Sequence, residues 1–167
     1  LAVHLEKLEA GVSVVQIVGE FEDKLNAADL TLLIQKPETP VYVMADGRHF
    51  WRVIDNLMNN ICKYAQPGTR VYVDLRENGG QVELIFRNTS RYPLNISSEE
   101  LMERFVRGDE SRNTEGSGLG ISIAKSLMEL MGGSFMLYVD GDLFKVVLGF
   151  AQMEEEKEPL DEDKSGK

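Results

Sequence analysis

The stretch RVYVDLRENGGQVELIFRN, residues 70–88, restricts the fold of this chain more than any other part of the sequence. Two runs of alternating apolar and polar residues flank Asn78-Gly79, a dipeptide favoured in tight turns between antiparallel strands. Because successive side chains of a strand point to opposite faces, each run has one apolar face. The stretch therefore predicts a β-hairpin that packs one face against other elements.

Shorter patterns predict the remaining elements. Strands are expected from Leu30 to Gln35 and from Pro40 to Ala45, and a last hairpin turns at Gly141-Asp142. Helices are expected in four places: over about 12–28, from a cap at Asp46 to before Pro67, from Ser97 or Ser98 to Phe105, and from the glycine-rich stretch GSGLG to Gly132-Gly133. The polar segment from Thr89 to Glu115 is either an element missed by the pattern or a functional lid.

These elements predict a single α+β domain, a two-layer α/β sandwich in which helices cover one face of a mixed, mostly antiparallel sheet. The 167 residues suffice for one compact domain and are too few for two. We place this domain at residues 1–152. Residues 153–167 are acidic and contain no aromatic residue, and we interpret them as a disordered tail.

Charge and cysteine content exclude several classes of protein. The formal net charge of −10 argues against a nucleic-acid-binding protein, which normally has a basic surface. Cys62 is the only cysteine, which rules out an internal disulfide and favours a reducing compartment. No apolar run approaches the ~20 residues of a membrane span, and LAVHLEKLEAG lacks the features of a signal peptide. Because the chain starts without Met, we expect it to be a piece of a longer protein.

The helix after Asp46 is rich in asparagine, a mediocre helix former whose amide competes for backbone groups. Its apolar residues share one face at spacings of three and four: Phe50, Val53, Ile54, Leu57, Met58 and Ile61. A second stripe beside it consists of Asp55, Asn56, Asn59, Asn60 and Lys63. Taken alone, this helix supports two interpretations equally: a face exposed to water, or one wall of a ligand pocket.

The pocket interpretation depends on the chemistry of amide oxygens. Magnesium takes hard oxygen ligands, keeps several waters and usually shares its coordination with substrate phosphates. An asparagine oxygen can serve this ion without adding negative charge near a polyphosphate. Lys63 could neutralise a phosphate, and Tyr64 could offer its ring to a base. On this interpretation the stripe predicts a nucleotide pocket.

The stretch EGSGLGISIAK places Gly116, Gly118 and Gly120 where a polar loop meets a helix. Helix N-termini present free N–H groups that suit phosphate, and glycine lets a ligand approach the backbone. The alternative is a flexible loop with glycines that serve packing. The spacing is not that of a dinucleotide-binding fold, and the motif lacks the Lys of a P-loop. The motif therefore argues against a dinucleotide-binding dehydrogenase.

Together these segments resemble the ATP-binding catalytic domain of a bacterial sensor histidine kinase, which has a Bergerat-type fold. The superfamily also includes DNA gyrase, mismatch-repair ATPases and a class of heat-shock chaperones. MADGRHFWRVIDNLMNNICKYA is similar to the family's N box, and ERFVRGDESRNTEGSGLGISIAKSLMELMGG resembles its F and G2 boxes. The resemblance extends over roughly residues 5–150.

The resemblance implies a role for each matching residue. Asn60 matches the asparagine that ligates magnesium, and Asn56 matches the one that lines the phosphate region. Lys63 and Tyr64 match positions that contact phosphate and adenine, whereas Asn59 is expected to be a bystander. The lid and the G2 box supply the remaining candidates, namely cations at Arg107 and Arg112 and nucleotide contacts at Gly116, Gly118, Leu119 and Gly120.

One stretch departs from the family pattern. The family's G1 box carries an Asp and two glycines, and the Asp accepts from the adenine amino group. Here the equivalent stretch is FRNTSRYPLNIS, with Asn88 at the Asp position and no glycine. An Asn oxygen can still accept from that amino group. Loop geometry, affinity and base selectivity are left open by this departure.

The resemblance implies the cofactors ATP and Mg²⁺ and transfer of the γ-phosphoryl group to a histidine. Hydrolytic relatives place a Glu base where this chain has Asn56, which cannot take a proton, so transfer is favoured over hydrolysis. The alternatives are an ATP-hydrolysing module and a non-catalytic nucleotide-binding module. The altered stretch at Asn88 favours the non-catalytic module. His4 and His49 both lack an acceptor context, so the isolated chain is expected to bind ATP without labelling itself.

The partners follow from the same resemblance. We expect the phosphoacceptor histidine on dimerisation helices that precede Leu1 in the intact protein, and a response regulator as the indirect partner. The domain is expected to be a soluble, cytoplasmic part of a membrane-anchored sensor that itself contacts neither nucleic acid nor the membrane.

Overall fold

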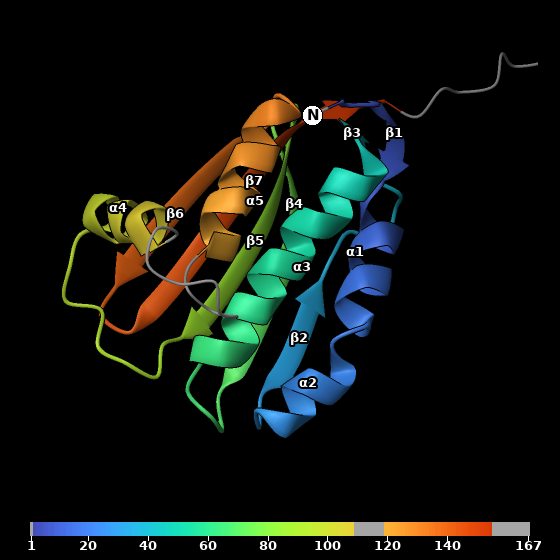
Figure 1. Ribbon diagram of the computed structural model, residues 1–167. Coiled ribbons are helices and arrows are strands. Elements are labelled where there is room, and N and C mark those ends of the chain that lie inside the picture. The colour runs from blue at the N-terminus through green and yellow to red at the C-terminus, as the bar shows by residue number, and fades with distance from the viewer. Residues whose placement is uncertain (1, 109–118, 155–167) are drawn as a thin grey trace, which may run out of the picture.

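A seven-stranded sheet forms one layer of the molecule in the computed structural model, which describes residues 2–108 and 119–154 (Figure 1). Among the strands described, only β2 and β4 pair in parallel, which confirms the expected mixed, mostly antiparallel sheet. Strand β6 (Ser134–Asp140) pairs with one side of β7. The other strands follow the order β1 (Glu6–Glu9), β3 (Tyr42–Ala45), β7 (Leu143–Met153), β5 (Gln81–Thr89), β4 (Arg70–Asn78) and β2 (Thr31–Gln35).

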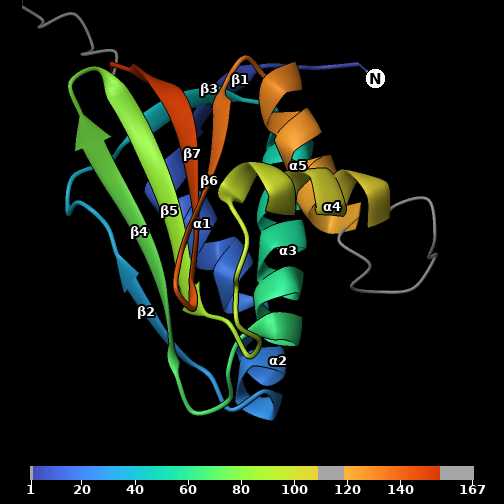
Figure 2. The same cartoon turned by 90° about the vertical axis from the view of Figure 1, so that its left-hand side faces the viewer.

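The helices form the second layer. Figure 2, turned by 90°, shows α3, α4 and α5 on one face of the sheet, and α1 packs against α3. The predicted two-layer α/β sandwich is therefore confirmed. The helices are α1 (Ala10–Gly19), α2 (Glu22–Ala27), α3 (Gly47–Tyr64), α4 (Ser98–Gly108) and α5 (Leu119–Leu130).

The β4–β5 hairpin forms as predicted, but its turn lies one residue later than expected. Asn78 pairs with Gln81, so it belongs to β4 and the turn consists of Gly79 and Gly80. Both glycines have positive φ, 57° and 84°. A two-residue turn of this kind requires φ > 0 at both positions, which glycine adopts without a steric cost.

The single helix predicted over about 12–28 is in fact two helices. The residues whose spacing predicted this helix are all buried, namely Val14, Val18, Phe21 and Leu25. The spacing therefore identified the core residues correctly. The chain tightens between α1 and α2, where Glu20 N–H donates to Ile17 O (3.1 Å) and Phe21 N–H donates to Val18 O (3.0 Å). These three-residue hydrogen bonds interrupt the α-helix without moving its apolar residues out of the core.

The sequence pattern missed β1 and ended β7 too early. β1 has the sequence EKLE and lies at one end of the sheet order, so no apolar alternation marks it. β7 continues to Met153, the first residue assigned to the tail, because its last residues pair with β3. The rest of the predicted tail, residues 155–167, lies outside the described residues.

The other predicted elements agree with the structure. α4 begins after Ser97, whose Oγ accepts from Glu100 N–H (3.1 Å), and α5 ends before Gly132, which has a φ of 81°. α4 occupies part of the expected lid, whose residues from 109 onward lie outside the described part of the chain. In the ranges 2–108 and 119–154, no helix has the length and apolar character needed to cross a bilayer.

Candidate nucleotide-binding site

The orientation of α3 is set by its cap and its apolar stripe. Asp46 Oδ1 accepts from the backbone N–H groups of Arg48 (3.0 Å) and His49 (3.2 Å), and Oδ2 accepts from His4 N–H (2.8 Å). These hydrogen bonds lower the pKa of Asp46, and the bond from His4 N–H has the largest effect. All six residues of the predicted apolar stripe are buried, so the rotation of the helix is fixed and its asparagines lie to either side of the buried face.

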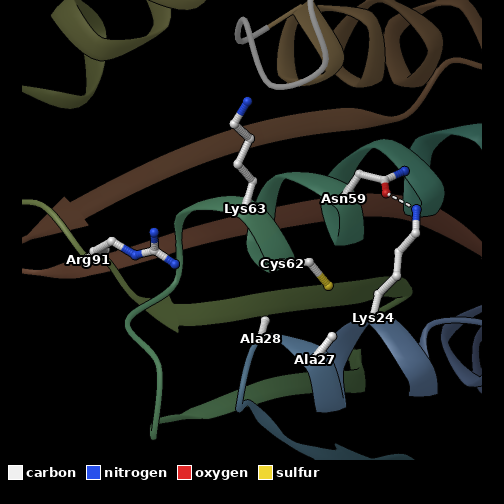
Figure 3. Close-up of a pocket in the computed structure, with 7 residues that line it drawn as sticks. All are labelled: Lys24, Ala27, Ala28, Asn59, Cys62, Lys63 and Arg91. Atoms are coloured by element: carbon white, nitrogen blue, oxygen red, sulfur yellow. Dashed lines mark hydrogen bonds between the residues drawn. The ribbon is translucent and has the colours of Figure 1, made fainter.

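The second stripe of α3 divides between two sides of the helix. Asn59 Oδ1 accepts from Lys24 Nζ at 2.9 Å, which turns Asn59 toward α2 (Figure 3). Asn60 instead lines a cavity on the side of β5, α4 and β7. Asn56 faces α5, where its Oδ1 lies 3.4 Å from the place a Cβ on Gly120 would occupy. The three asparagines of this helix therefore contact three different parts of the molecule.

The cavity that Asn60 lines has a volume of about 220 Å³ and mostly apolar walls. We call it the aromatic cavity because Tyr64, Tyr92, Phe105 and Phe144 contribute to its lining. The Phe105 and Phe144 rings meet edge to face, with centroids 6.2 Å apart, which joins α4 to β7. The remaining lining residues are Asn88, Ser90, Leu94 and Leu101.

Asn88 and Ser90 are the buried polar residues among those that line this cavity, and Asn88 is the more buried of the two. It lies near the end of β5 opposite Phe144 and is 4% exposed. Its Oδ1 has no hydrogen-bond partner among residues 2–108 and 119–154. A buried acceptor without a partner costs free energy, so a ligand that donates a hydrogen bond there would be favoured.

The segment after Asn88 keeps a defined position without the glycines of the family pattern. Gln66 N–H donates to Thr89 O (2.8 Å) and Arg91 N–H donates to Tyr64 O (2.8 Å), which ties the segment to the end of α3. Within the described ranges, Asp29 is the only non-glycine residue with positive φ. Ser90 and Tyr92, which stand at the two glycine positions, therefore have ordinary backbone and cause no strain there.

A second cavity of about 660 Å³ lies on the other side of the end of α3 (Figure 3). We call it the cationic cavity because Lys24, Lys63 and Arg91 line it, together with Asn59, Cys62, Ala27 and Ala28. Burial raises the pKa of the Cys62 thiol, against the opposing effect of Lys24. Lys63 Nζ also lies 5.8 Å from the centroid of the Tyr64 ring, so Lys63 stands between the two cavities.

Other predicted residues lie elsewhere. Arg107 is exposed and does not line the aromatic cavity; it lines a third cavity with Met102, Glu103, Val106 and Lys125. Leu119 begins α5, and Gly120 follows it against Asn56. Arg112, Gly116 and Gly118 lie outside the described residues.

Sequence reasoning missed several residues of the aromatic cavity. Leu101 and Phe105 belong to the apolar stripe of α4, which could have marked them as buried but not as pocket walls. No local pattern marks Ser90, Tyr92, Leu94 or Phe144 as lining a pocket. The sequence analysis also did not predict the cationic cavity or the part of Arg91 in its lining.

The residues present fit a purine nucleotide with magnesium. Nucleotide pockets combine apolar or aromatic walls with a few placed polar groups, as Tyr64, Phe144 and Asn88 do here. The described residues contain no cluster of three or more His, Cys, Asp or Glu side chains that could enclose a metal. A single amide oxygen, such as that of Asn60, suits an ion that keeps waters and shares phosphate oxygens.

A family model and several curated proteins match this chain. The family model described as histidine kinase-, DNA gyrase B-, and HSP90-like ATPase matches residues 45–159. The chain is 29% identical over 137 residues to the probable sensor kinase SilS of Salmonella typhimurium, covering 80% of the chain and 28% of SilS. It is 34% identical over 110 residues to the probable sensor protein PcoS of Escherichia coli, covering 64% of the chain and 24% of PcoS. The chain thus spans about a quarter of these relatives.

Solved structures share the fold. The catalytic domain of histidine kinase ThkA superposes with a TM-score of 0.76 at 18% identity, covering 89% of this chain and 96% of that one. ThkA in complex with the response regulator protein TrrA superposes with a TM-score of 0.71 at 15% identity, covering 93% of this chain and 44% of that one. The family model shows that the chain belongs to the histidine kinase-, DNA gyrase B- and HSP90-like ATPase family, and the curated sensor kinases that it matches identify it as an ATP-binding catalytic domain of the sensor histidine kinase type.

Proposed function

We propose that this domain binds Mg–ATP with its base in the aromatic cavity and donates the γ-phosphoryl group to a histidine on the dimerisation helices of the same kinase. The observation that carries the proposal is the meeting of Asn60 and the buried, unpartnered Oδ1 of Asn88 in one aromatic cavity, among the described residues of a chain of this family. Mg–ATP, when bound, supplies the phosphoryl group and a metal that neutralises phosphate charge.

The residues of the chain have separable tasks in this proposal. Tyr64 offers a wall to the base, and Asn88 Oδ1 accepts from its exocyclic amino group. Asn60 offers its amide oxygen to the metal. Lys63, between the two cavities, brings a positive charge to the phosphates.

Asn56 contributes on the phosphate side. Its Nδ2 is buried and has no hydrogen-bond partner within the described ranges, so it can donate to a phosphate oxygen. Its amide cannot accept a proton from water as a Glu base would. The nucleophile must therefore bring its own reactivity, as a histidine imidazole does, and for this reason the proposal favours transfer over hydrolysis.

Partners and location complete the proposal. A response regulator is the indirect partner, because the histidine that receives the phosphoryl group would pass it on. We place the domain in the cytoplasm, where ATP is available and where a single reduced thiol such as Cys62 is ordinary. Arg107 and Arg112 remain candidates for the phosphate end.

The two neighbouring asparagines of α3 provide a matched test. Asn60→Ala should weaken Mg–ATP binding at least about tenfold, the usual effect of disturbing a metal site. Asn59→Ala should change it less than about threefold, because Asn59 is hydrogen-bonded to Lys24 in the cationic cavity. Isothermal titration with a non-hydrolysable ATP analogue measures both. Equal losses would contradict the assignment of Asn60 to the metal.

A further inference from the structure

Asn88 offers a different recognition chemistry from a carboxylate at the same place. An ionised carboxylate only accepts hydrogen bonds, whereas an amide carries an accepting oxygen and a donating NH₂ group. Rotation of the amide by 180° about its last side-chain torsion exchanges these two groups. Asn88 can therefore present either an acceptor or a donor to the same point of the cavity.

No protein hydrogen bond among the described residues holds the Asn88 amide oxygen in one orientation. Its Oδ1 has no partner among the residues described, so turning the amide over breaks no protein hydrogen bond at that atom. The neighbouring lining residue across the β5–β7 pair is Phe144, whose ring imposes no donor or acceptor preference. At 4% exposure, the side chain is also shielded from water that could compete with the ligand.

Purine nucleotides differ at the position that such a group reads. Adenine carries an amino donor at carbon 6 and an accepting ring nitrogen beside it. Hypoxanthine and guanine carry an accepting oxygen at carbon 6 and a donating N–H beside it. With the six-position facing Asn88, one amide orientation pairs with the first pattern and the opposite orientation pairs with the second.

We infer that Asn88 makes this domain a binding site for both 6-amino and 6-oxopurine nucleotides. This inference rests on the proposed function, because it assumes that the base occupies the aromatic cavity. A carboxylate at residue 88 would favour the 6-amino purine, because one of its oxygens could accept from the ring N–H of a 6-oxopurine but the other would face the 6-oxo group as acceptor against acceptor.

Equilibrium binding of three diphosphates tests the inference: adenosine diphosphate, inosine diphosphate, and the diphosphate of purine riboside, which has no group at carbon 6. Inosine diphosphate, rather than guanosine diphosphate, serves as the 6-oxopurine probe because it lacks the additional 2-amino group. The wild-type chain should bind the adenosine and inosine compounds within about tenfold of each other, and both at least about fivefold more tightly than the purine riboside compound.

Asn88→Asp, measured at pH 8 to keep the carboxylate ionised, should keep adenosine diphosphate binding and lose at least about tenfold in affinity for inosine diphosphate. Asn95→Asp is the matched control, because Asn95 is exposed, lies on the same segment and does not line the aromatic cavity. It should leave the ratio of the two affinities unchanged. Circular dichroism checks that both variants fold, and the wild-type ratios test the inference without either variant.

Four outcomes would overturn the inference. If wild type binds adenosine diphosphate but inosine diphosphate more than about 100-fold more weakly, the inference fails while the proposed function stands. If all three diphosphates bind equally, or if Asn88→Asp leaves their ratio unchanged, Asn88 does not read the six-position. If no diphosphate binds at all, the proposed function fails together with the inference.

Discussion

Asp46 holds the first turn of α3 through Oδ1, which accepts from Arg48 N–H and His49 N–H, and ties down the N-terminal segment through Oδ2, which accepts from His4 N–H. A carboxylate that accepts several backbone hydrogen bonds is stabilised in its charged form. The pKa of Asp46 is accordingly below its ordinary value of 3.8. Because α3 carries Asn56 and Asn60, this cap also positions the candidate site.

The sign of the pH effect follows from that lowered pKa. The stabilisation from ionised Asp46 is fully present above the unfolded-state pKa, near 3.8, and is lost as the pH falls toward the lower folded-state value. Asp46→Asn keeps a capping oxygen but cannot titrate. We expect wild type to lose stability more steeply than Asp46→Asn as the pH falls below about 3.8. Urea unfolding midpoints measured across this range test the difference, and parallel curves would contradict it.

At the scale of elements, α5 and β6 meet through a glycine that leaves no room for a side chain. A Cβ on Gly133 would lie 2.6 Å from Gly149 O and 2.7 Å from Met128 Cε. The turn between the helix and the strand is held by Gly133 N–H, which donates to Met128 O at 2.9 Å. α5 packs against α3 as well, so a shift at this turn reaches the helix that carries the asparagines.

Gly133→Ala should therefore lower the free energy of unfolding by about 1–3 kcal/mol, the usual cost of inserting a group into a packed site. Gly47→Ala is the control, because a Cβ on Gly47, in the first turn of α3, meets no atom within 4 Å. The control should be neutral or stabilising by up to about 1 kcal/mol, since alanine is the better helix former. Urea denaturation measures both. A comparable loss in both variants would show that the close contacts at Gly133 are not the cause.

At the scale of the whole molecule, both histidines lie far from the candidate site. His49 lies in the first turn of α3, and Asn60 lies eleven positions later in the same helix, about 16 Å along its axis at a rise of about 1.5 Å per residue. His4 lies at the same end of α3 as His49, because its N–H donates to Asp46. Neither imidazole can reach a phosphate bound near Asn60 in the same chain.

The isolated chain should consequently bind ATP without forming acid-labile phosphate on His4 or His49. Incubation with γ-labelled ATP tests this, and adding the dimerisation helices of the kinase should produce label on a histidine of those helices. The matched control is Asn60→Ala, which should abolish that transfer. Rapid hydrolysis by the isolated chain, lost in Asn60→Ala, would instead place a general base near the phosphates and overturn the role given to Asn56.

The sequence by itself determined the parts of the molecule that local patterns control. The apolar stripe of α3 was predicted residue by residue, because the 3.6-residue period decides which side chains share a face. The β4–β5 hairpin and the last hairpin followed from alternation and from glycine-containing turns. The exact turn and the division of the first helix were not predicted, since single-residue shifts leave the apolar pattern unchanged.

Only the tertiary structure decided what each exposed face meets. Asn59 and Asn60 are adjacent in sequence and chemically identical, yet one bonds to Lys24 from α2 and the other lines a cavity with Asn88 and Phe144. Periodicity states which residues turn away from the core but not which strand or helix covers them. That choice depends on the pairing of β5 with β7 and on the packing of α4, which bring together residues far apart in sequence. The candidate base site exists because of these long-range contacts.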